Sequence, residues 1–178
     1  EKLEDVAQDN CKVMCLLNNE TQRVGQDEES VKERRVVFVA ETTADRREDR
    51  EKIQRELEGH GYIVSPKQPL AMESARLRQE IQTIVSQASH SVHLIGEEYG
   101  IVPEGETQSI IEIQQALAME HSANQDLSCL LWLPKNLQAK DERQTTFIQS
   151  MRQTEDRHAT IELLESSLED LKTHLLDR

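Results

Sequence analysis

The feature that most constrains the fold is an alternation between short apolar runs and segments with helical periodicity. An unbroken apolar run of strand length is typical of a parallel strand covered on both faces. Such runs occur at residues 36–40, 62–64, 92–95 and 127–133, and a more polar segment at 159–162 is expected to pair as an edge strand. Successive parallel strands need crossovers, so the alternation predicts one parallel sheet with helices on both faces.

Apolar stripes predict the helices between these strands. The clearest stripe contains Leu77, Ile81, Ile84, Val85 and Ala88. Others contain Ile53 and Leu57, then Ile110, Ile113 and Leu117, and finally Leu164, Leu168, Leu171 and Leu175 in a closing helix. A polar helix is expected within residues 138–156, and the long run at 127–133 is expected in the middle of the sheet. The predicted fold class is α/β, a flavodoxin-like five-stranded parallel sheet of order 2-1-3-4-5.

Residues 1–34 differ in composition from the rest of the chain. Asp, Glu, Asn, Gln and Lys dominate this segment, and its only apolar cluster is Val13, Met14, Leu16 and Leu17. We predict a polar tether with room for one short helix, followed by one domain at residues 35–178. The chain begins at Glu1 without an initiator Met, so we expect a piece of a longer protein.

Charge and cysteine content exclude several classes of function. The chain carries 21 basic and 34 acidic residues, a net charge of -13, which argues against binding to nucleic acid.

No apolar run approaches the roughly 20 residues of a membrane span, and no leader opens the chain, so a cytoplasmic protein without a membrane partner is expected. Cys11, Cys15 and Cys129 lack the spacing of a zinc site, and no bound metal is predicted; a metal or redox role for Cys11 and Cys15 is the lesser alternative.

Ligands of such sheets bind beyond the carboxyl ends of the strands, which selects the loops at residues 41–45, 65–70 and 96–106. No Walker loop, GxGxxG turn, nucleophile elbow or HExxH motif occurs in the chain. The carboxylates in or after these loops are Glu41, Asp45, Glu97, Glu98, Glu104, Glu106 and Glu112. A carboxylate beside a sugar ring stabilises an oxocarbenium-like transition state, so these loops favour cleavage of glycosidic or N-ribosidic bonds.

Several individual residues have two interpretations. Glu112 stands among Ile110, Ile111 and Ile113, so it lies either in a cleft or on the solvated flank of a helix. His93 is expected in the core or on a face of the sheet, with a role as a base as the lesser alternative. Trp132 is expected in the core, although it could line the mouth of the site. Arg46 and its neighbour Arg47 either meet a pyrophosphate or pair with nearby acidic residues as a solvated charge run.

Two stretches resemble the TIR (Toll/interleukin-1 receptor) domains of bacterial immune proteins: VFVAETTADRREDREKIQRELEGHGYIVSP and SVHLIGEEYGIVPEGETQSIIEIQQALA. The resemblance in the order of strands and helices extends over residues 35–176. It implies the same flavodoxin-like fold and an NAD-cleaving activity, which releases nicotinamide together with ADP-ribose or a cyclic isomer. NAD would be the substrate, and neither cofactor nor metal would be needed.

The resemblance also implies a set of site residues. Glu112 matches the catalytic Glu in the helix after the third strand, and Tyr99 matches a Tyr of the preceding loop. Gln108 stands where the family often has Trp. The remaining matches lie at the end of the first strand and in its following loop, which touches the nucleotide in the family: Phe38, Ala40, Glu41, Thr42, Asp45 and Arg46. Residues 65–70 match the BB loop, which gates the site and mediates contacts between TIR domains.

The resemblance further implies activation by homo-oligomerisation, an upstream sensor module and a role in antiviral defence. A non-enzymatic adaptor that acts by homotypic TIR assembly is an alternative, which Gln108 in the Trp position favours. The GEEYG element with its downstream Glu is also similar to nucleoside deoxyribosyltransferases, so a nucleoside-processing enzyme is a further alternative.

Overall fold

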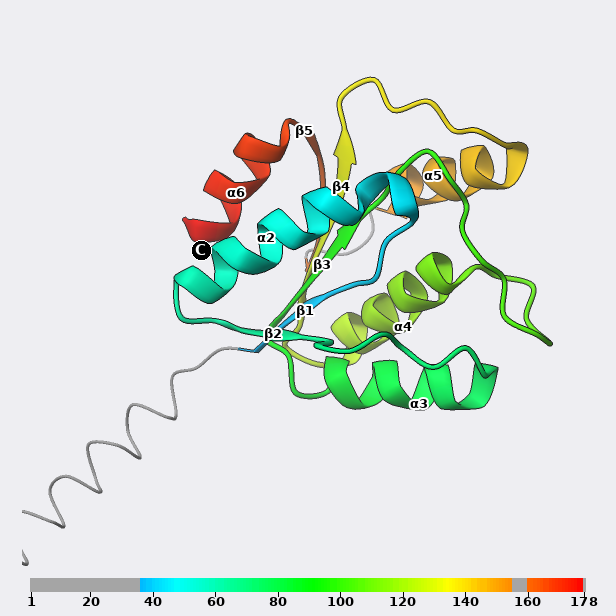
Figure 1. The fold of residues 1–178 in the computed structure, drawn as a ribbon, viewed down its shortest axis with the longest axis horizontal. Helices are drawn as coiled ribbons and strands as arrows, with labels where there is room; N and C mark the ends of the chain where they lie inside the picture. Colours follow the sequence, from blue (N-terminus) through cyan, green and yellow to red (C-terminus); the bar gives the residue numbers. More distant parts are fainter. Residues whose placement is uncertain (1–35, 155–159, 178) are drawn as a thin grey trace, which may run out of the picture. The chain divides into compact units, whose positions relative to one another are not determined.

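A computed structural model describes residues 36–154 and 160–177 (Figure 1). Its sheet has five parallel strands in the order β2-β1-β3-β4-β5. The strands are β1 (Val36–Val39), β2 (Ile63–Ser65), β3 (His90–Leu94), β4 (Ser128–Pro134) and β5 (Ile161–Ser166). This is the flavodoxin-like order that the apolar runs predict. The predicted tether at residues 1–34 lies outside the described residues.

Helices cover both faces of the sheet. The helical elements are η1 (Ala44–Arg46), α2 (Arg47–Gly59), α3 (Ser74–Val85), α4 (Ile110–Asn124), α5 (Glu142–Thr154) and α6 (Leu168–Leu176). In Figure 1, α2 and α6 lie on one side of the strands, whereas α3, α4 and α5 lie on the other. Between residues 36–154 and 160–177, no helix is long and apolar enough to cross a membrane.

Side-chain alternation along the strands divides the core into two layers. On β1, Val37 packs with the apolar residues of α2 and α6, whereas Phe38 packs with those of α3, α4 and α5. Trp132 is buried in the α2 and α6 layer, where its indole N–H donates to Oγ of Ser166 at 3.2 Å. The core position predicted for Trp132 is therefore confirmed.

The end of the chain differs from the sequence-based expectation. Leu164 belongs to β5, opposite Trp132 of β4, and not to the closing helix. The strand also extends to Ser166, beyond the predicted segment at 159–162. Helix α6 begins only after Ser167, whose side chain accepts the N–H of Asp170 in a capping box.

The run at 127–133 is predicted in the middle of the sheet, but the strand that it forms, β4, is next to the edge strand β5. The central strand of the five is β3.

An ion pair joins the loop before α4 to α3. Arg78 donates to both carboxylate oxygens of Glu106, at 2.9 and 2.8 Å, and the Ser74 hydroxyl donates to the same carboxylate. These bonds hold the pKa of Glu106 at about 2, below its ordinary value of 4.5. Ionised Glu106 therefore stabilises the fold above its unfolded-state pKa, and this contribution is lost as the pH falls from 4.5 toward 2.

The stability difference between the wild type and Glu106→Gln is expected to depend on pH. The wild-type advantage in free energy of unfolding should be constant above about pH 6 and should shrink steadily below the ordinary carboxyl pKa. Urea denaturation at a series of pH values measures it. Glu104→Gln, an exposed change in the same loop, is the control. An advantage of Glu106 that grows on acidification would contradict the assignment.

Candidate active site

Glu112 lies in the first turn of α4, where the helix cap fixes its backbone. The buried hydroxyl of Ser109, the N-cap, accepts the N–H of Glu112 at 3.3 Å. Ile111 and Ile113 on either side are buried, and the Glu112 side chain is half-buried. A helix N-terminus favours negative charge, so this position suits a carboxylate.

Both oxygens of the Glu112 carboxylate have donors. The Tyr99 hydroxyl donates to Oε2, and the Gln108 amide donates to Oε1 at 3.0 Å. The hydroxyl oxygen of Tyr99 in turn accepts the N–H of Ser109 at 3.4 Å. Burial, followed by the bond to Glu112, raises the pKa of Tyr99, so its phenol keeps the proton that it donates.

The Glu112 side chain lines a pocket between α4, the loop at 96–106 and α5. The pocket has a volume of about 470 Å³, which is typical of small-molecule sites. Its lining consists of Tyr99, Thr107, Glu112, Glu142, Arg143, Thr146, Phe147 and Ser150. Phe147 meets the Tyr99 ring edge to face at 6.4 Å between centroids, and Cζ of Arg143 lies 4.8 Å from the centroid of that ring. A carboxylate, a guanidinium and an aromatic wall thus share one pocket.

The substrate-binding residues that are predicted at the end of β1 and in the loop after it do not line the Glu112 pocket. Phe38 and Ala40 are buried in the core, and Thr42 is half-buried. Glu41 exchanges two hydrogen bonds through its backbone with the amide of Gln114 on α4, at 2.8 and 3.2 Å. The Glu41 carboxylate accepts the N–H of Leu70 at 2.8 Å, so it ties this loop to residues 65–70.

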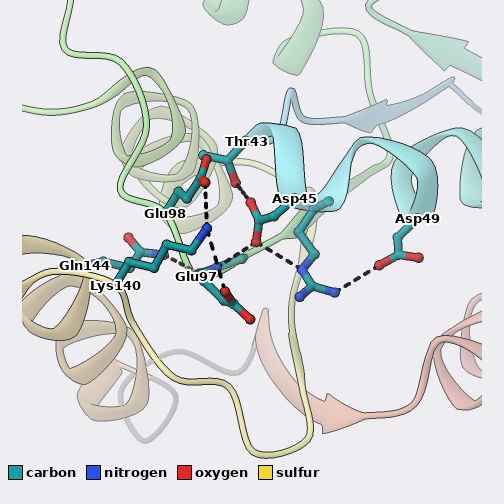
Figure 2. Close-up of polar contacts among 9 residues, drawn as sticks. Thr43, Asp45, Asp49, Glu97, Glu98, Lys140 and Gln144 are labelled. Atoms are coloured by element: carbon teal, nitrogen blue, oxygen red, sulfur yellow. Dashed lines mark hydrogen bonds and ion pairs between the residues drawn. The ribbon is translucent and has the colours of Figure 1, made fainter.

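Asp45 is the centre of a polar network at the carboxyl edge (Figure 2). Its carboxylate accepts the Thr43 hydroxyl at 2.5 Å and the N–H of Glu97 at 2.8 Å. It also lies 3.4 Å from Nε of Arg46. A Cβ added to Gly96 would lie 2.2 Å from Oδ2 of Asp45, so a larger residue here would force the Asp45 carboxylate to move.

Charge pairing completes the same network. Nη1 of Arg46 lies 3.1 Å from the carboxylate of Asp49, so Arg46 has two carboxylate partners. This agrees with the pairing in the charge-run interpretation, but the Arg46 side chain is only 18% exposed and is not fully solvated. Nζ of Lys140 lies 2.8 Å from Glu98 and 3.9 Å from Glu97. Figure 2 shows Asp45, Glu97 and Lys140 gathered where the loops after β1 and β3 meet the chain before α5.

The structure brings together part of the predicted site. Tyr99 and Gln108 both donate to Glu112, whereas Asp45 and Arg46 belong to the carboxyl-edge network and do not line the Glu112 pocket. Sequence reasoning missed Arg143 and the other pocket residues of α5. The sequence predicts only a polar helix there, and nothing in its periodicity marks the face that meets Tyr99.

Two other titratable groups are core residues. His93 is buried, and its ring meets Phe38 edge to face at 5.7 Å between centroids, so its predicted core position is confirmed. Burial lowers its pKa to about 3, which keeps the imidazole neutral. Cys129 is also buried, and burial raises the pKa of its thiol to about 11, which makes it a poor nucleophile. Cys11 and Cys15 lie outside the described residues.

No group of three or more His, Cys, Asp or Glu side chains suited to a metal ion occurs within the described part of the chain. Comparison with protein-family models gives no match, and comparison with curated proteins gives none either.

Proposed function

We propose that this chain is a TIR-type enzyme that cleaves the bond between nicotinamide and ribose in NAD. The observation that carries the proposal is the Glu112 carboxylate, half-buried at a pocket, with each oxygen held by one donor. Such an arrangement presents a fixed negative charge to a bound sugar. Cleavage at C1′ develops positive charge on the ribose, and a preorganised carboxylate stabilises that charge.

In the proposed reaction, Glu112 binds and stabilises the ribose, and the substrate supplies its own leaving group. Each Glu112 oxygen keeps a lone pair that can accept a ribose hydroxyl of the substrate. The bond between C1′ and the pyridinium nitrogen breaks, its electron pair leaves with neutral nicotinamide, and the ribose takes the positive charge. Water then adds to C1′ and releases a proton, which gives ADP-ribose; attack by the adenine would give a cyclic isomer. Tyr99 and Gln108 position the carboxylate throughout.

Fold and sequence support the TIR assignment together. The flavodoxin-like sheet is the fold of that family, and the GEEYG stretch supplies Tyr99 beside Glu112. Gln108, which occupies the position of the family's Trp, donates to Glu112 here. An amide in that position thus holds the carboxylate by a hydrogen bond. Activation by homo-oligomers, an upstream sensor and a role in antiviral defence are parts of the same proposal.

A second candidate function is assembly without catalysis. A groove of about 680 Å³ runs along residues 63–70 and α3, on the edge of the sheet that β2 forms. Ile63 is 38% exposed at this groove, which suits contact between copies of the chain. In this alternative the 65–70 loop mediates homotypic binding, and the Glu112 pocket turns over no substrate.

Incubation of the full chain with NAD tests the proposal. The protein is assayed dilute and artificially clustered on beads, and nicotinamide is measured by chromatography, with purine and pyrimidine nucleosides in parallel reactions. We expect nicotinamide from NAD, more of it from the clustered protein, and no free base from the nucleosides. Self-association without nicotinamide release would support the adaptor instead. Release of free base from nucleosides alone would support a nucleoside-processing enzyme.

A further inference from the structure

Arg143 supplies a positive charge to the Glu112 pocket. Among the described residues that line this pocket, it is the one cationic side chain, beside the carboxylates of Glu112 and Glu142. We propose that Arg143 binds a phosphate group of the substrate, so that the pocket selects phosphorylated nucleotides over free nucleosides. This inference rests on the proposed function and names the substrate class of the same site.

The guanidinium of Arg143 is free to take an anionic ligand. Within residues 36–154 and 160–177, no hydrogen bond or ion pair joins it to another side chain, and it stacks on the face of Tyr99. Other arginines are already engaged: Arg46 with Asp45 and Asp49, Arg78 with Glu106, and Arg152 with Glu165. Stacking on an aromatic ring orients a guanidinium and leaves its N–H groups at the edge, where they match two phosphate oxygens.

Tyr99 contacts both charged groups of the proposed subsite. Its hydroxyl donates to Glu112, while Arg143 lies over its ring at 4.8 Å from the centroid. The carboxylate and the guanidinium therefore contact the same tyrosine, one at its hydroxyl and the other over its ring. In a nucleotide, C1′ and the 5′-phosphate are separated by the ribose ring and one methylene. We expect Glu112 at C1′ and Arg143 at the phosphate of the same nucleotide, because both side chains line one pocket.

The charge of the whole chain favours a local cation at the site of this substrate. With a net charge of -13, the protein repels an anionic dinucleotide at long range. Arg46, the expected phosphate ligand, lies outside the pocket and has two carboxylate partners. Arg143 carries no such partner among the described residues, so its charge is available to offset the field at the site.

Kinetics with a graded set of substrates tests the inference. The clustered full chain is assayed for nicotinamide release from NAD, nicotinamide mononucleotide and nicotinamide riboside, which lacks phosphate. Arg143→Gln is expected to raise KM for the two phosphorylated substrates about 10-fold, with little change in kcat or in the use of the riboside. Arg143→Lys should recover part of the loss. Arg152→Gln, on the same helix and outside the pocket, is the charge-matched control.

Binding of ADP-ribose, measured by calorimetry, gives a readout that needs no turnover. Arg143→Gln should weaken it about 10-fold, whereas Arg152→Gln should not. Equal ADP-ribose affinity in the wild type and Arg143→Gln, or an equal loss of activity toward the riboside, would overturn the inference. If the wild type releases no nicotinamide from any substrate, the proposed function fails, and ADP-ribose affinity alone decides the role of Arg143. Arg143 is exposed, so unchanged melting temperatures should confirm that these variants fold.

Discussion

Replacing Glu112 by Gln is expected to lower the kcat for nicotinamide release from NAD by about 10²- to 10³-fold. The substitution keeps the size of the side chain and removes its negative charge, so the positive charge at C1′ loses its counterpart in the transition state. An amide carbonyl can still accept from Tyr99, and the half-buried position has room for the change. The measurement is the initial rate of nicotinamide release by the clustered full chain.

Glu120→Gln provides the matched control for this prediction. Glu120 lies on the same helix, is exposed and does not line the pocket, so its change should leave the rate unaltered. Melting temperatures of both variants should stay close to that of the wild type. Full NAD cleavage by Glu112→Gln would rule out Glu112 as the catalytic carboxylate.

Replacing Gly96 by Ala is expected to lower the free energy of unfolding by about 2 kcal/mol. The added Cβ would lie 2.2 Å from Oδ2 and 2.7 Å from Cγ of Asp45. Asp45 cannot move away without loss of its hydrogen bonds from Thr43 and from the N–H of Glu97. Urea denaturation of the full chain measures the effect.

A double-mutant cycle separates this steric conflict from a general cost of the substitution. In an Asp45→Ala background the conflict is absent, so Gly96→Ala should cost much less there than in the wild type. Gly59→Ala is the matched control, because a Cβ at Gly59 meets nothing within 4 Å. An equal cost of Gly96→Ala in both backgrounds would show that the contact with Asp45 does not determine the requirement for glycine.

The apolar runs and stripes of the sequence predict most of the strands and helices, but they misplace the boundary between β5 and α6. Leu164 and Leu168 have helical spacing, yet Leu164 pairs with β4 and α6 begins after Ser167. Periodicity alone cannot separate a strand from a helix over so short a segment, because the pairing partner is distant in sequence. The Ser167 and Asp170 capping box was a local signal for the true start of α6.

The candidate site depends more on tertiary contacts than the fold does. The GEEYG stretch and the downstream Glu predict that Tyr99 and Glu112 belong together, and the two side chains are hydrogen-bonded. Arg143 reaches the same pocket only because α5 packs beside the loop at 96–106, which no spacing along the chain reveals. Asp45 looks like a candidate ligand in the sequence, but its oxygens take up structural contacts with Thr43 and Glu97.

The central claim is that the ribose of NAD binds at Glu112, and the most direct test is a structure of the full chain with a non-hydrolysable NAD analogue. We predict the hydroxyls of the nicotinamide ribose within hydrogen-bonding distance of the Glu112 carboxylate, inside the pocket that Glu112 lines together with Tyr99 and Arg143. An analogue bound elsewhere, with Glu112 still engaged only by Tyr99 and Gln108, would contradict the account.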